Sequence, residues 1–150
     1  MRDLKCVRVL LAAADRDIEI LQLMHDSTGG PDEIFGFHAQ QAAEKSLKAW
    51  LAFLGEVYPL THDLDDLLER LSKRDADVSK YRELTAYSAF AVQFRYEGMT
   101  EGFSIDRERA LHLVSALLQQ VRRMAEAEAE MTRKTNGDGQ DRDSTTQNLD

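Results

Sequence analysis

The fold of this chain is decided by one stretch of its sequence, Phe37-His38-Ala39-Gln40-Gln41-Ala42-Ala43-Glu44-Lys45-Ser46-Leu47-Lys48-Ala49. Apolar side chains recur through and around this stretch at spacings of three and four, which is typical of an α-helix with a buried face. We predict a helix that begins near Asp32 as its N-cap and ends near Leu54, with Gly55 as its C-terminal stop. Its apolar face contains Phe35, Ala39, Ala43, Leu47, Trp50, Leu51 and Leu54.

Helical periodicity continues outward from this stretch in both directions. Before it, the pattern predicts an amphipathic helix over roughly residues 3–26, ended by a Gly-Gly-Pro sequence. After it, we expect a short helix capped by Asp63 and another helix over roughly residues 79–94. A long last helix follows, capped by Ser104 or Asp106.

Short connections between consecutive helices favour antiparallel neighbours. The sequence therefore predicts an all-α fold, an antiparallel up-and-down bundle of four to five helices, over residues 1–131. In residues 132–150 the only apolar residue is Leu149. Because so little apolar surface cannot offset the entropy of ordering, we expect a disordered polar tail there.

The composition limits the possible partners and chemistries. The 150 residues carry a net charge of −8, so the surface repels polyanions on average. The single Cys6 excludes an internal disulfide and a zinc–thiolate site, and it fits a reducing compartment. No run approaches the roughly 20 apolar residues of a membrane span. We therefore expect a cytoplasmic protein with no membrane partner.

Motifs for metal, phosphate-loop and serine-hydrolase chemistry are not found in the sequence. It contains no Glu-x-x-His, no pair of histidines at helical spacing, no Gly-rich phosphate loop and no Gly-x-Ser-x-Gly. We expect no metal site and no resident cofactor. The sequence leaves open whether the protein binds a nucleotide.

Polar residues on the helix that decides the fold have two interpretations. Glu44 and Lys48 stand at i and i+4, a pair that supports a helix by about 0.2–0.5 kcal/mol. Lys45 and Lys48 are three residues apart, so both ammonium groups can approach one phosphate, with Gln41 on the same strip. The alternative is that these side chains form a solvated face of the helix.

Three residues farther along the chain are also candidates for a site. His62 precedes a predicted helix N-terminus, where an imidazole can satisfy a backbone N–H or bond the neighbouring helix. Arg95 and Tyr96 follow the predicted end of a helix. They can bond the terminal carbonyl groups, or they can clamp and stack a nucleobase.

These pieces stand in an order that resembles one known family. The order is Gln-Ala-Ala-Glu-Lys-x-x-Lys-Ala at 41–49, His-x-Leu at 62–64 and Arg-Tyr at 95–96. It resembles the HEPN domain family, named for nucleotide binding in higher eukaryotes and prokaryotes, over roughly residues 5–127. The resemblance implies a helical bundle with a site for a nucleotide or a partner. That site would consist of Gln41, Lys45, Lys48, His62, Arg95 and Tyr96.

The resemblance implies two alternative functions. HEPN proteins of this type resemble the helical domain that follows the catalytic domain of aminoglycoside-type nucleotidyltransferases. They often work beside a separate small nucleotidyltransferase in a two-protein, toxin–antitoxin-like module. On this interpretation the chain is the helical partner, which binds nucleotide and has no catalysis of its own.

The alternative is a metal-independent endoribonuclease toxin, for which RNA would be the partner. Many HEPN domains are ribonucleases with an Arg followed, after four to six residues, by a His. The His serves as general acid and base while the Arg steadies the charge on the phosphate. Arg107 and His112 match this spacing, as an Arg-x4-His motif. Glu108 departs from the family pattern, because it places a negative charge directly after the Arg.

The resemblance also implies a homodimer. The central predicted helix has large aromatic side chains around more than one face, which is more than one buried stripe needs. These side chains are Phe35, Phe37, Trp50 and Phe53.

Overall fold

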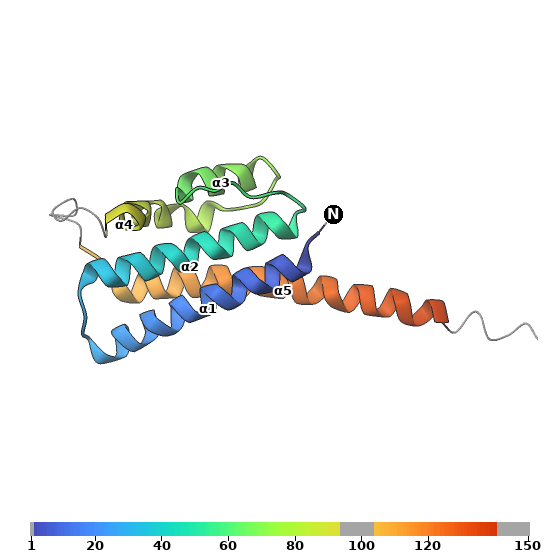
Figure 1. Ribbon diagram of the computed structural model, residues 1–150, viewed down its shortest axis with the longest axis horizontal. Helices are drawn as coiled ribbons and strands as arrows, with labels where there is room; N and C mark the ends of the chain where they lie inside the picture. Colours follow the sequence, from blue (N-terminus) through green and yellow to red (C-terminus); the bar gives the residue numbers. More distant parts are fainter. Residues whose placement is uncertain (1, 94–103, 141–150) are drawn as a thin grey trace, which may run out of the picture.

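The computed structural model describes residues 2–93 and 104–140 of the chain. These residues form five α-helices, one 3-10 helix and no strand. The α-helices are α1 (Leu4–Ser27), α2 (Asp32–Phe53), α3 (Leu64–Ser72), α4 (Ser88–Gln93) and α5 (Arg107–Gln140), and the 3-10 helix η1 (Ser79–Tyr87) precedes α4. The predicted all-α bundle of four to five helices is confirmed (Figure 1).

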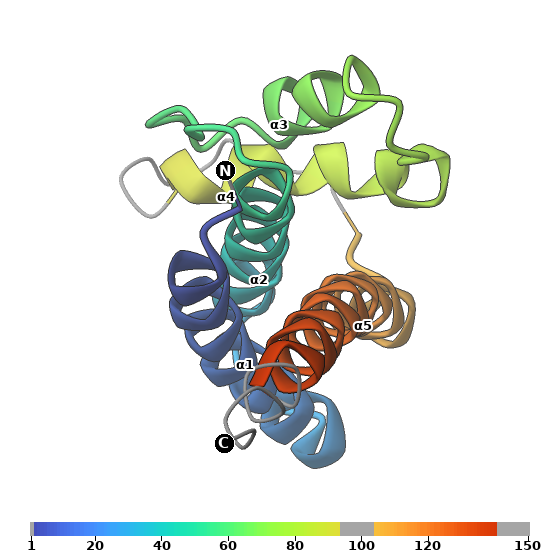
Figure 2. The ribbon, with the colours of Figure 1, turned by 90° about the vertical axis from the view of Figure 1, so that its right-hand side faces the viewer.

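Helix α2 is the centre of the bundle. Helices α1 and α5 pack against it on one side, and α3, η1 and α4 lie over it as a second layer (Figures 1 and 2). From Ala42 to Phe53 every side chain except that of Lys45 is buried, because neighbours surround the helix. Of the four aromatic residues that suggested a dimer, three are buried within a single copy and Phe37 is half-buried. The homodimer therefore stays a prediction that rests on the resemblance.

The directions of the long helices follow from contacts at their ends. The backbone N–H of Asp3 donates to the carbonyl of Ala52 at 3.4 Å, so α1 begins where α2 ends. Arg107, the first residue of α5, donates to the carbonyl oxygens of Gly29 and Gly30 just before α2. Helix α5 therefore runs antiparallel to α1 and in the same direction as α2 (Figure 1). The second layer makes this possible, since it returns the chain to the end of the bundle where α2 begins.

The predicted helix starts are confirmed at two of three positions. The carboxylates of Asp63 and Asp106 accept hydrogen bonds from backbone N–H groups two and three residues onward, which caps α3 and α5. At α2 the N-cap is Pro31, and Asp32 is the first helical residue. The Asp32 carboxylate instead pairs with Arg107.

The helix predicted over residues 79–94 is two elements. The chain winds as the 3-10 helix η1 before it becomes α4. A 3-10 helix has three residues per turn, so side chains three apart lie above one another. The buried residues of this segment have that spacing, and they are Val78, Tyr81, Leu84, Tyr87 and Phe90. Phe94 lies outside the described residues.

The start of the expected disordered tail needs a correction. Helix α5 continues to Gln140, so residues 132–140 are helical, while residues 141–150 lie outside the described part of the chain. An existing helix extends at little cost, because each added residue gains one hydrogen bond. The hydroxyls of Thr132 and Thr135 also donate to carbonyl groups one turn back. Residues 130–138 are all exposed, so this part of the extension buries no side chain.

Candidate functional site

Polar side chains of α2 form two hydrogen-bonded clusters, one with a residue of the loop before α3 and one with a residue of α1. We call the two clusters together the α2 strip. The α2 strip consists of Asp17, His38, Gln40, Gln41, Glu44, Lys45, Lys48 and His62. Four of these residues, Asp17, Gln40, Glu44 and Lys48, are buried although three of them carry a charge. A buried charge costs several kcal/mol unless it is paired and hydrogen-bonded, so the partners of each group matter.

Glu44 is the centre of the first cluster in the α2 strip. Its Oε1 accepts from Lys48 Nζ at 2.8 Å, and its Oε2 accepts from Gln40 Nε2 at 2.7 Å. His62 Nδ1 lies 3.0 Å from the same Oε2, and Gln40 also donates to the His62 carbonyl. This cluster ties the loop before α3 to the middle of α2.

The ionised form of Glu44 is favoured despite its burial. Burial raises the pKa of this carboxyl, but hydrogen bonds from Lys48, Gln40 and His62 outweigh that effect and hold the pKa below its ordinary value of 4.5. Glu44 and Lys48 are 5% and 8% exposed, respectively. They form a buried ion pair at neutral pH, in the i, i+4 arrangement that the sequence predicts.

Asp17 of α1 is the centre of the second cluster. Its Oδ2 accepts from Lys45 Nζ at 2.6 Å, and its Oδ1 lies 2.9 Å from His38 Nδ1. Sequence reasoning missed both Asp17 and His38. A signal for Asp17 exists, because it lies three residues after Ala14 and four before Leu21, in register with the buried face of its helix.

The two lysines are held by different carboxylates. Lys45 pairs with Asp17, whereas Lys48 pairs with Glu44. The two ammonium groups are therefore not arranged to bind one phosphate together. The solvent-facing edge of the α2 strip consists of Gln41, Lys45 and His62. The Lys45 side chain is 28% exposed and the His62 side chain 68% exposed. Arg95 and Tyr96 lie outside the described residues.

The loop before α3 also covers the end of α2 through Tyr58. The Lys48 ammonium lies 5.7 Å from the centroid of the Tyr58 ring, and Cys6 Sγ lies 3.8 Å from the Tyr58 hydroxyl. The hydrogen bond with Cys6, followed by burial, raises the pKa of Tyr58. Lys48 is thus enclosed by Glu44 and this ring, which explains why it does not reach solvent.

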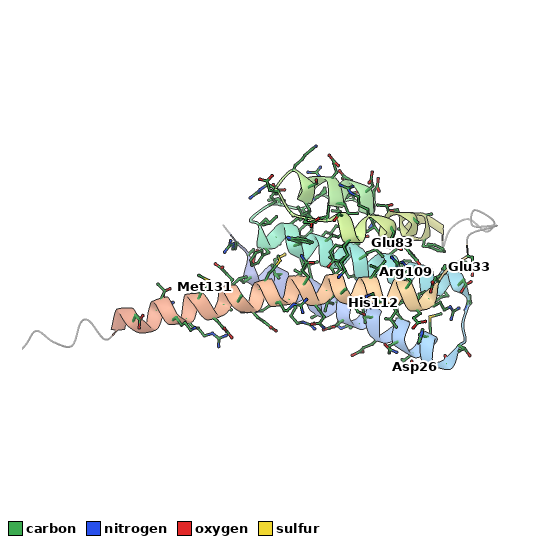
Figure 3. All side chains as sticks on the ribbon, turned by 180° about the vertical axis from the view of Figure 1, so that it is seen from behind. Asp26, Glu33, Glu83, Arg109, His112 and Met131 are labelled. Atoms are coloured by element: carbon green, nitrogen blue, oxygen red, sulfur yellow. The ribbon has the colours of Figure 1, made fainter. Side chains whose placement is uncertain are left out.

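Arg107 and His112 are not brought together. Arg107 donates to the carbonyl oxygens of Gly29 and Gly30 at 2.6 and 2.7 Å and pairs with Asp32, and its guanidinium lies over the Phe35 ring. His112 is exposed on the outer surface of α5 (Figure 3). Residues five apart on an α-helix point about 140° away from each other. Arg107 therefore fastens the start of α5 to the start of α2, away from His112.

Residues 2–93 and 104–140 contain neither a metal-binding cluster nor a membrane-spanning helix. No group of three or more His, Cys, Asp or Glu side chains in these ranges could hold a metal ion. None of the helices described is both long enough and apolar enough to cross a membrane.

Comparison with known proteins identifies one family. The family described as the HEPN domain matches residues 7–124, which extend from α1 into α5 and include the whole α2 strip. No curated protein and no solved structure matches the chain. The match ends next to Ala125, the last buried residue of α5.

Proposed function

The chain belongs to the HEPN domain family, and we propose that it is a helical binding module that assembles with a small nucleotidyltransferase and helps to hold a nucleotide. The observation that supports this proposal is the α2 strip, whose two clusters each hold a buried carboxylate paired with a lysine and whose edge is exposed. Buried ion pairs give little net stability compared with apolar side chains of the same volume. A central helix that retains them is therefore a candidate for a binding surface.

The exposed edge of the α2 strip suits an anionic group. The Lys45 ammonium has three N–H donors and uses one of them on Asp17. His62 faces Glu44 through Nδ1, which leaves Nε2 for a ligand. Gln41 stands one helical turn before Lys45 on α2 and donates to Gln40. A phosphate oxygen or a partner's carboxylate can reach this edge without breaking the bonds inside the strip.

The six residues of the proposed site have different roles. Lys48 is too buried to touch a ligand, so it acts by holding Glu44 in place. Gln41, Lys45 and His62 make the direct contacts. Arg95 and Tyr96 belong to the proposal through the family resemblance.

The test is the binding of ATP to Lys45→Ala, measured by calorimetry, together with co-purification of a nucleotidyltransferase encoded beside this protein. We expect at least tenfold weaker ATP binding, because one charge-assisted contact is worth roughly 1.5–3 kcal/mol. The matched control is Lys73→Ala, which removes an exposed lysine that follows α3. Equal binding by the two variants, with circular dichroism unchanged, would overturn the proposed site.

The ribonuclease alternative has its own test on the same preparation. No feature of the described residues favours it, because Arg107 is engaged in structural bonds. We expect purified protein and its His112→Ala variant to leave a single-stranded RNA substrate equally intact. Cleavage that His112→Ala abolishes would establish the alternative.

We also propose a homodimer, on the strength of the family resemblance. Sedimentation equilibrium at micromolar concentration should give about twice the chain mass of 17.0 kDa. A single species of the chain mass at that concentration would contradict it.

A further inference from the structure

A second candidate site lies in a cleft between α1 and α5. The cleft has a volume of about 280 Å³, and its apolar lining consists of one leucine and three alanines. Arg8 and Asp15 of α1 and Arg122, Glu126 and Arg133 of α5 provide its charged lining. This is a different surface from the α2 strip, because Asp15 and Asp17 point about 200° apart around α1.

The cleft is locally basic on an acidic protein. Three guanidinium groups face two carboxylates there, whereas the whole chain carries a net charge of −8. Arg122 pairs with Asp15, and Arg133 makes one 3.4 Å hydrogen bond to a carbonyl of its own helix. The Arg8 side chain has no hydrogen-bond or ion-pair partner within residues 2–93 and 104–140. Most of the N–H groups of Arg8 and Arg133 are therefore available to a ligand.

We infer that the α1–α5 cleft binds a small phosphorylated molecule whose apolar part lies on the alanine-lined floor. A guanidinium presents a planar fork of donors that matches the oxygens of a phosphate group. The alanine side chains leave room for a flat ring, over which a guanidinium can stack. The volume is near the lower limit for small-molecule sites, which are typically about 300–1,000 Å³. An extended polyanion is disfavoured because the chain as a whole carries a net charge of −8.

The experiment compares four probes by calorimetry on the full chain: pyrophosphate, ATP, adenosine and a short single-stranded RNA. We expect ATP to bind more tightly than pyrophosphate, because the floor contributes, and adenosine to bind at least tenfold more weakly than ATP. If pyrophosphate bound as tightly as ATP, the alanine-lined floor would make no contribution to binding. That result would overturn the proposed apolar contact and leave a site for phosphate alone. If RNA bound more tightly than ATP and the loss of Arg8 weakened that binding, the proposal that the ligand is a small molecule would be overturned.

Variants of the cleft should change binding in opposite directions. The double variant Arg8→Ala/Arg133→Ala should weaken ATP binding at least tenfold. Asp15→Asn should strengthen it severalfold, because it removes a negative charge and releases Arg122. The matched control is Arg123→Ala, since Arg123 is exposed next to Arg122 on α5 but does not line the cleft. All of these side chains are exposed or half-exposed, so the variants should fold.

The inference uses no residue of the α2 strip, so the two sites can fail separately. Loss of ATP binding in the arginine double variant but not in Lys45→Ala would support the cleft as the binding site. It would also show that the α2 strip does not bind the nucleotide. Loss in Lys45→Ala alone would overturn the cleft. An Asp15→Asn variant that binds ATP more weakly than the wild type would also overturn it.

Discussion

Glu44 accepts hydrogen bonds at both of its carboxylate oxygens, and its main partner is as deeply buried as it is. Replacing Glu44 by Ala leaves the Lys48 ammonium buried without its counter-ion. Removal of one member of a buried pair typically costs about 3–5 kcal/mol, and we expect a loss of that size in the free energy of unfolding. Urea denaturation followed by circular dichroism measures it.

The control for this variant is Glu69→Ala, which removes an exposed carboxylate on α3 and should change stability by less than about 0.5 kcal/mol. Glu44→Ala/Lys48→Met should recover much of the loss, because it removes both charges. Equal stability of the two single variants would mean that the buried pair contributes nothing to the fold.

Acid should weaken the protein partly through Glu44. Its pKa is lower in the folded state than the ordinary 4.5, so its ionised form adds stability above that pH. The contribution is lost as the pH falls below about 4.5 and through the folded pKa. Urea denaturation at pH 7, 4.5 and 3 should show a smaller acid-induced loss for Glu44→Gln than for the wild type. Parallel losses in the two proteins would show that other carboxyl groups dominate.

At the level of single residues, spacing predicts only the local contacts of the α2 strip. The Glu44–Lys48 pair follows from one helical turn, and the structure confirms it. The partner of Lys45 is Asp17, 28 residues earlier, and no spacing within one helix can predict a contact between two helices. The burial of Lys48 depends on Tyr58, which only the folded loop brings near.

Close packing between two elements explains a glycine in α2. A Cβ atom on Gly36 would lie 2.5 Å from the ring of Phe90 in α4. Gly36→Ala should therefore lower the free energy of unfolding by about 1–3 kcal/mol, the usual cost of overpacking. This cost exceeds the roughly 0.5–1 kcal/mol that alanine gains over glycine inside a helix. Chemical denaturation measures the difference.

The chain offers a matched control for this variant in Gly137. It lies in α5, and a Cβ atom there meets nothing within 4 Å, so Gly137→Ala should not destabilise the protein. Phe90→Leu should relieve part of the cost in the double variant with Gly36→Ala, since the two positions are in contact. Additive effects of the two substitutions would contradict the proposed contact.

At the level of elements, the long helices could be predicted and the second layer only in part. Helices α1 and α2 have apolar residues at spacings of three and four, and their observed ends lie within one or two residues of those predicted. In η1 the buried residues recur every three positions, and the sequence prediction assumed a period of 3.6. A strict period of three from Val78 to Phe90 was the signal that could have revealed the 3-10 winding.

The end of α5 extends beyond the bundle as an exposed helix (Figure 1). Removing residues 132–150 should leave the melting temperature unchanged within about 2 °C, because the described residues among them bury no side chain. The same truncation removes Arg133, so it should weaken ATP binding at the α1–α5 cleft. A fall in melting temperature of more than about 5 °C would mean that the extension stabilises the bundle.

At the level of the whole molecule, the fold class and the family follow from the sequence, whereas the cleft does not. The Gln-Ala-Ala-Glu-Lys stretch lies inside the matched HEPN region. The cleft joins Arg8 to Arg133 across almost the whole chain, and these residues share no motif. Only the docking of α5 on α1 brings them to one surface.

The position of Arg2 has a consequence for the connectivity of the chain. Its guanidinium lies 2.5 Å from the Glu128 carboxylate, so the first described residue is next to the last packed turn of α5. The packed part of the chain therefore begins and ends at nearly the same place in the bundle. A circular permutant that joins Met131 to Arg2 by a short linker, and opens the exposed turn at Asp75, should keep the same core.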